Sequence, residues 1–146
     1  MPQSTAIDAV VSYARTFLGV PYLWGGNNRL VGLDCSGFVC EVLRSFGLVA
    51  ANADYCASEI YQILTENPAF LKLQTPEKGA ILFFGTPIKH VAICVDKIRM
   101  IEAGGGGPTV TSFNVAARFG ALIRERPIAN RTDLSGIVMP VYPEIE

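Results

Sequence analysis

The chain has 146 residues, of which 50% are hydrophobic and 17% are charged, and its net charge is −1. This balance suits one packed domain spanning residues 1–146 and excludes a disordered linker protein. Because the basic residues are few and scattered, nucleic acids and anionic membranes are excluded as partners.

The cysteine and histidine content excludes a metal centre. Four cysteines without a C-x-x-C pair and a single histidine do not supply a tetrahedral zinc site, so we expect no metal and no cofactor. Cys40, Cys56 and Cys94 are predicted to be small buried apolar residues. The N-terminus lacks the basic start and apolar stretch of a signal peptide, and no apolar run is long enough to span a bilayer.

The first half of the chain has a helical pattern. Apolar residues recur with helical spacing from Ile7 to Leu18, which predicts a first helix with a capping box at Thr5 and Asp8 and a stop at Gly19. A turn-rich stretch follows over residues 21–32.

Two further helices are predicted after the turns. Asp34 is placed as the N-cap of a second helix that begins at Cys35 and ends at Gly47. A shorter helix covers Ser58 to Thr65.

The second half is typical of strands, because short segments rich in β-branched and aromatic residues alternate with Gly, Pro or charged pairs. The predicted strands are Ala80–Gly85, His90–Asp96, Ile98–Ala103, Pro108–Ser112, Ala121–Glu125 and Gly136–Tyr142. The glycines at 104–107 are predicted to form a loop. Helices followed by consecutive strands indicate an α+β fold, an antiparallel sheet with the helices packed on one side.

Cys35 is the first candidate for chemistry. Its place in the first turn of a helix puts the sulfur near unpaired N–H groups and the positive end of the helix dipole, which favour a thiolate. The same N–H groups could hold the oxyanion that forms when a thiolate attacks a carbonyl. The alternative is a cysteine that packs beneath the start of the helix.

His90 is the second candidate. It opens a predicted strand on the same face as Ala92 and Cys94, whose small side chains leave room beside the imidazole. One cysteine and one histidine form the minimum set for thiol catalysis, although a lone histidine is more often a polar residue at a strand end.

Four segments together resemble the NlpC-type family of papain-like cysteine peptidases that act on the bacterial cell wall. They are Gly-Val-Pro-Tyr-Leu-Trp-Gly-Gly at 19–26, Leu-Asp-Cys-Ser-Gly-Phe-Val at 33–39, Gly-Ala-Ile-Leu-Phe-Phe-Gly at 79–85 and His-Val-Ala-Ile at 90–93. The resemblance runs from about the first helix to Gly104 and implies a papain-like fold. It also implies hydrolysis of amide bonds in peptidoglycan stem peptides, commonly between γ-D-glutamate and a diamino acid, with Cys35 as nucleophile and His90 as base.

The resemblance also implies roles for three neighbours of the nucleophile. Tyr22 is expected to hydrogen-bond near Cys35, while Asp34 and Ser36 are expected to bind the stem peptide. From the residues alone, Tyr22 could be a turn aromatic, Asp34 only a helix cap and Ser36 a residue of the first turn without a role.

The chain departs from the family pattern at two positions. The third catalytic residue of the family is usually His, Asn or Gln, whereas this chain has Glu102, whose carboxylate can accept the imidazole N–H and fix its tautomer. Glu102 shares a face with His90 only if the loop between the two strands has an odd number of residues, so we predict three or five around Asp96. The second departure is Ala80 in place of the family's Asp, for which we expect a structural effect only.

Two other functions stay open at this level. The same fold and nucleophile could serve an acyltransferase, a deamidase or a toxin. A non-catalytic module for binding or assembly, in a phage tail or a secretion apparatus, would fit the apparent lack of a signal peptide. If the chain acts on periplasmic or extracellular peptidoglycan, we expect a partner to deliver it.

Overall fold

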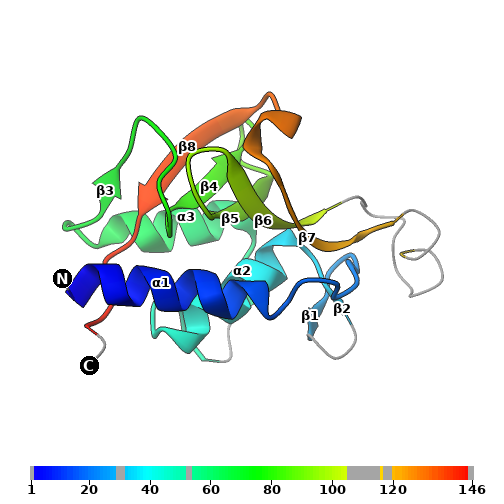
Figure 1. Ribbon diagram of the computed structural model, residues 1–146, viewed down its shortest axis with the longest axis horizontal. Coiled ribbons are helices and arrows are strands. Elements are labelled where there is room, and N and C mark those ends of the chain that lie inside the picture. The colour runs from blue at the N-terminus through cyan, green and yellow to red at the C-terminus, as the bar shows by residue number, and fades with distance from the viewer. Residues whose placement is uncertain (1, 29–31, 52–53, 105–115, 117–119, 145–146) are drawn as a thin grey trace.

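The computed structural model describes residues 2–28, 32–51, 54–104, 116 and 120–144 (Figure 1). Within them the helices are α1 (Pro2–Arg15), α2 (Cys35–Ser45), α3 (Ala57–Glu66) and the short 3-10 helix η1 (Ile128–Asn130). The predictions for α2 and α3 are confirmed.

Helix α1 differs from its prediction at both ends. It begins at Pro2, so Thr5 lies inside the helix and the predicted capping box with Asp8 is wrong. Proline is tolerated at the first helical position because the N–H of that residue makes no hydrogen bond within the helix. The helix can therefore begin before the polar residues that were expected to cap it. The chain turns after Arg15, and Gly19, with φ +90°, donates its N–H to the carbonyl of Ile123.

The described strands form a small hairpin and one main sheet. The hairpin pairs β1 (Asn27–Asn28) with β2 (Gly32–Leu33). The main sheet, within the described residues, has six strands in the order β3-β8-β4-β5-β6-β7, and all its pairings are antiparallel. Its strands are β3 (Leu71–Lys72), β4 (Ile81–Phe84), β5 (His90–Cys94), β6 (Arg99–Gly104), β7 (Leu122–Pro127) and β8 (Leu134–Met139).

Most of the strand predictions are confirmed to within three residues at each end. The strand predicted at 108–112 and the loop at 105–107 lie outside the described residues, and Gly104 ends β6. Strands β1, β2 and β3 were not predicted. Each has only two residues, too few for an alternating pattern to be recognised.

The helices lie along one side of the sheet, which confirms the α+β class (Figure 1). Helix α2 packs on β5 and β6 through the buried side chains of Phe38, Val39, Val42 and Leu43. Helix α1 packs beside α2, and in the turn that follows α1 the ring of Phe17 meets the ring of Phe38 edge-on at 5.6 Å between centroids. This packing carries the first turn of α2 to strand β5.

The hairpin between β5 and β6 has the odd loop that the sequence required. Cys94 pairs with Met100, and the Val95 N–H donates to the Arg99 carbonyl at 2.9 Å, which leaves residues 96–98 as a three-residue connection. The Asp96 carboxylate accepts the N–H groups of Ile98 and Arg99 and closes this turn. Even-numbered residues of the two strands therefore share a face.

Position 37, in the first turn of α2, requires glycine because the backbone at Gly26 passes very close to it. A Cβ atom at this position would lie 2.2 Å from the carbonyl oxygen of Gly26 and 2.9 Å from Oδ1 of Asp34. The absence of a side chain lets the turn before β1 rest directly on the start of α2.

We therefore predict that Gly37→Ala destabilises the protein by about 1–3 kcal/mol, because the backbone of the turn before β1 must move. Gly136→Ala is the matched control, since its Cβ would make only an ordinary contact 3.5 Å from Tyr61. Urea unfolding of both variants measures the difference. Equal stability of the two variants would contradict the close approach.

Candidate active site

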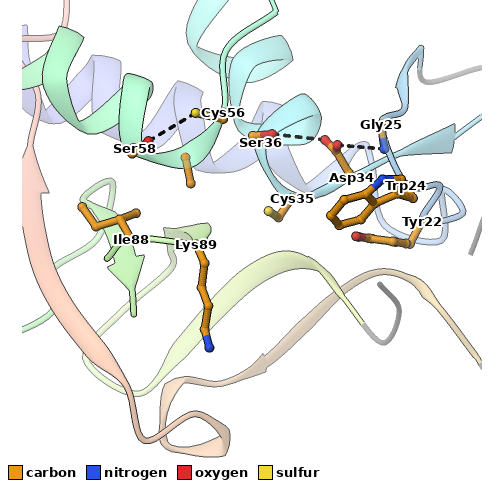
Figure 2. A pocket seen from close by; sticks show the side chains of 11 residues that line it. Tyr22, Trp24, Gly25, Asp34, Cys35, Ser36, Cys56, Ser58, Ile88 and Lys89 are labelled. Atoms are coloured by element: carbon orange, nitrogen blue, oxygen red, sulfur yellow. Dashed lines mark hydrogen bonds between the residues drawn. The ribbon is translucent and has the colours of Figure 1, made fainter. Parts of the chain in front are cut away.

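A pocket of about 300 Å³ lies beside the start of α2 (Figure 2). Its walls come from the turn before β1, the first turns of α2 and α3, and the loop that precedes β5. The lining residues are Tyr22, Trp24, Gly25, Asp34, Cys35, Ser36, Cys56, Ala57, Ser58, Ile88 and Lys89. Tyr22, Asp34, Cys35 and Ser36, predicted from the sequence, thus lie together.

Asp34 fixes the position of the thiol. Its Oδ1 accepts the Gly37 N–H at 2.7 Å and the Ser36 hydroxyl at 3.3 Å, while Oδ2 accepts the Gly25 N–H at 3.1 Å. Burial raises the pKa of Asp34 above its usual range, against the lowering effect of these hydrogen bonds. The predicted N-cap is confirmed, and the same carboxylate joins α2 to the turn at Gly25.

Cys35 is half-buried, with its sulfur against strand β5. The backbone N–H groups of Val91 and Ser36 hydrogen-bond to this sulfur. Val91 directly follows His90, so the start of α2 lies against the strand that carries the histidine, 55 positions further along the sequence.

The Ser36 N–H at the helix start lowers the pKa of the Cys35 thiol, as expected, but other effects outweigh it. Burial, and to a smaller extent the nearby Asp34 carboxylate, raise the pKa of the Cys35 thiol to a net value of about 11. The N–H groups of Val91 and Ser36 and the charge of Arg131 lower it by less. Cys35 therefore needs a base to lose its proton near neutral pH.

His90 and Glu102 form a buried pair across β5 and β6, beginning at the residue before Val91. Nε2 of His90 lies 2.6 Å from Oε1 of Glu102, and the two residues are only 8% and 3% exposed. Burial acts to raise the pKa of Glu102, but His90, Arg126 and Arg131 together hold it below its usual range. The odd hairpin loop has brought the two side chains together, as the register argument required.

Tyr22 and Trp24 lie on the same side of the pocket as Asp34 (Figure 2). Burial raises the pKa of Tyr22 to about 12, and the charges of Cys35 and Asp34 act in the same direction. The Tyr22 hydroxyl therefore stays protonated at physiological pH. It is available there as a hydrogen-bond donor.

Sequence reasoning missed several of the lining residues. Trp24 was within a recognised motif, but Ser58 and Lys89 gave no signal because α3 and the loop before β5 reach the pocket only through tertiary packing. Cys40 and Cys94 are buried as predicted. Cys56 is exposed, a correction, because it is the N-cap residue of α3, where its N–H donates to Glu59 at 3.0 Å.

Within the part of the chain that the structure describes, no cluster of three or more His, Cys, Asp or Glu side chains could hold a metal ion. Among these same residues, no helix has both the length and the apolar character needed to cross a bilayer.

A thiol at the head of a helix, packed against a strand that carries a buried histidine, defines the papain-like class of α+β proteins. The sequence profile of the NlpC/P60 family matches residues 19–123. The chain therefore belongs to the NlpC/P60 family, and the match extends beyond Gly104, where the resemblance noted in the sequence ended.

Similar proteins include enzymes named for action on the cell wall. The chain is 30% identical over 116 residues to the probable peptidoglycan endopeptidase LytE of Bacillus subtilis, covering 76% of this chain and 31% of LytE. It is 27% identical over 103 residues to the γ-D-glutamyl-L-lysine dipeptidyl-peptidase of Bacillus cereus, covering 67% of this chain and 28% of that protein. The chain thus spans about a third of the length of these relatives.

Solved structures share the fold. The peptidoglycan hydrolase RipB from Mycobacterium tuberculosis superposes with a TM-score of 0.67 at 20% identity, covering 97% of this chain and 67% of that one. RipD from the same species, described as a non-catalytic NlpC/p60 domain protein adapted to peptidoglycan binding, gives 0.65 at 18% identity, covering 93% and 97%.

The electrostatics of the pocket generate a prediction for Asp34→Asn. The amide oxygen can still cap α2, but loss of the carboxylate charge removes one cause of the raised Cys35 pKa. Alkylation of Cys35 by iodoacetamide, followed by peptide mass spectrometry across pH, should show its midpoint moving to lower pH. Asp8→Asn, which alters a surface ion pair between Asp8 on α1 and Lys78, is the control and should leave the midpoint in place.

Proposed function

We propose that the chain is a cysteine endopeptidase that hydrolyses amide bonds in peptidoglycan stem peptides, with γ-D-glutamyl–diamino acid bonds as the substrate class. The observation that carries the proposal is the contact of the Cys35 sulfur with strand β5, beside the buried pair of His90 and Glu102. The names of the LytE and γ-D-glutamyl-L-lysine peptidase relatives support the substrate. Residues 1–146 are proposed to act as one domain.

The first chemical step is proton transfer from Cys35 to His90. A carboxylate only accepts hydrogen bonds, so Nε2 of His90 carries the hydrogen that Glu102 receives at 2.6 Å. This tautomer leaves the lone pair on Nδ1 to take the thiol proton. Glu102 stabilises the imidazolium that results, which offsets the high pKa of the buried thiol.

The thiolate then attacks the carbonyl carbon of the amide. The backbone N–H of Cys35 at the start of α2 holds the oxygen that becomes negative, because the Gly37 and Phe38 N–H groups are taken by Asp34, and the His90 imidazolium gives its proton to the leaving amine. Water, deprotonated by His90, then hydrolyses the thioester. The cycle returns Cys35 as a thiol and needs no cofactor.

The pocket provides the contacts for the stem peptide. Asp34 and Ser36 are proposed to bind its polar groups, and the protonated Tyr22 hydroxyl to donate a hydrogen bond near the reacting carbonyl. Asp34 also caps α2, so the two roles that the sequence left open for this residue are compatible.

A binding function is the second candidate, because RipD is described as a non-catalytic protein of this fold. The fold alone therefore does not distinguish hydrolysis from binding. The case rests on the side chains, since a module that only binds has no need of a buried histidine–carboxylate pair beside a thiol. The relatives give no support to the phage-tail alternative.

Cys35→Ala should abolish the release of stem-peptide fragments from purified sacculi, measured by liquid chromatography and mass spectrometry, because the nucleophile is lost. Cys40→Ala is the matched control, since Cys40 lies in the core away from the pocket, and it should keep its activity. Circular dichroism checks that both variants fold. Release by Cys35→Ala at the wild-type rate would refute hydrolysis by this thiol.

Glu102→Ala should lower kcat by roughly 10²- to 10⁴-fold, because His90 loses the acceptor that fixes its tautomer. Glu102→Gln should lose less, since its amide oxygen can accept the same hydrogen. Initial rates on a stem-peptide substrate at neutral pH compare the two. Equal losses would show that hydrogen-bond acceptance by residue 102 has no catalytic role.

A further inference from the structure

The carboxylate at position 102 presents an electrostatic problem that a neutral residue would not. Glu102 is 3% exposed, and a buried carboxylate without a counter-charge costs several kcal/mol. His90 satisfies Oε1 but, while neutral, offers only a hydrogen bond. The second oxygen, Oε2, lies 3.6 Å from Nη1 of Arg126 on strand β7.

The sheet register places Arg126 for this contact. Met100 pairs with Arg126, Glu102 pairs with Arg124, and Cys94 pairs with Met100. Because paired residues share a face and side chains alternate along a strand, His90, Glu102 and Arg126 lie on one face across three neighbouring strands. The guanidinium, histidine and carboxylate thus form a row.

Arg126 is distinguished from the other charged groups around this row. The guanidinium of Arg131 also acts on Glu102, but Asp133 holds it through two hydrogen bonds of 3.1 and 3.0 Å. Its carbon Cζ also stands 5.0 Å from the centre of the Phe84 ring, which in turn contacts the His90 ring at 5.4 Å between centroids. The further charged or titratable groups near the row are Cys35 and Asp34 from α2, Arg124 from β7 and Lys89 before β5.

We propose that Arg126 is a positioning residue that supplies the counter-charge for Glu102, so that a carboxylate can orient His90 in this member of the family. The inference rests on the proposed function for its kinetic test. Arg126 touches neither substrate nor thiol and acts through Glu102. The proposal predicts that the effects of substitutions at positions 102 and 126 on kcat/KM are coupled. Replacing Arg126 should lower kcat/KM only while residue 102 carries a negative charge.

The test is a double-mutant cycle of wild type, Arg126→Gln, Glu102→Gln and the double variant, with kcat/KM followed across pH on a stem-peptide substrate. Loss of a positive charge makes the His90–Glu102 pair bind protons more readily, so Arg126→Gln should move the profile to higher pH. It should also lower kcat/KM roughly tenfold at neutral pH, and by less than about twofold when Glu102→Gln is already present. Arg126→Lys, which keeps the charge, should retain the wild-type profile.

Arg15→Gln is the matched control, because it removes the partner of Glu125 on the other face of β7 and should leave the profile unchanged. Equal effects of Arg126→Gln in both backgrounds, or failure of Arg126→Lys to retain the profile, would overturn the proposal.

A second readout does not depend on activity. The chain has one histidine, so the imidazole signals in a ¹H–¹³C NMR spectrum report on His90 alone. The pH titration of these signals should move to higher pH in Arg126→Gln than in wild type. The shift between Glu102→Gln and the double variant should be smaller. An unmoved titration would overturn the role of Arg126, whereas a wild-type protein that releases no fragments from sacculi would overturn only the proposed function.

Discussion

The cap on helix α2 is the interaction on which the site depends. The Asp34 carboxylate ties the first turn of the helix to the turn at Gly25, and Gly37 lets these backbones approach without a side chain between them. With the helix start fixed, the sulfur of Cys35 rests on strand β5. The geometry of the pocket is therefore a consequence of helix capping and of one close backbone contact.

The same arrangement makes the thiol dependent on its neighbours. Burial and the Asp34 charge both raise the pKa of Cys35, so the residue that fixes the nucleophile also opposes its ionisation. A base with a buried carboxylate behind it offsets this cost, because it stabilises the proton that the thiol gives up. In the proposed mechanism, position and activation come from different parts of the fold, the helix start and the sheet.

Local patterns predicted much of this structure. The Asp34 cap, the extents of α2 and α3, and the strands of the antiparallel core follow from spacing, turn residues and side-chain alternation. The requirement that His90 and Glu102 share a face also predicted an odd hairpin loop, which the structure has. Two-residue strands and the early start of α1 were missed, because such short or marginal segments carry no periodic signal.

The sequence by itself determined the family, the positions of the candidate thiol, histidine and carboxylate, and the odd loop length that the last two require. Only the tertiary structure decided that the thiol is half-buried, that Cys56 is exposed in the pocket wall, and that Arg126 lies beside Glu102. These features depend on desolvation and on contacts between distant elements. A linear pattern does not encode either, because both arise when helices and sheet pack together.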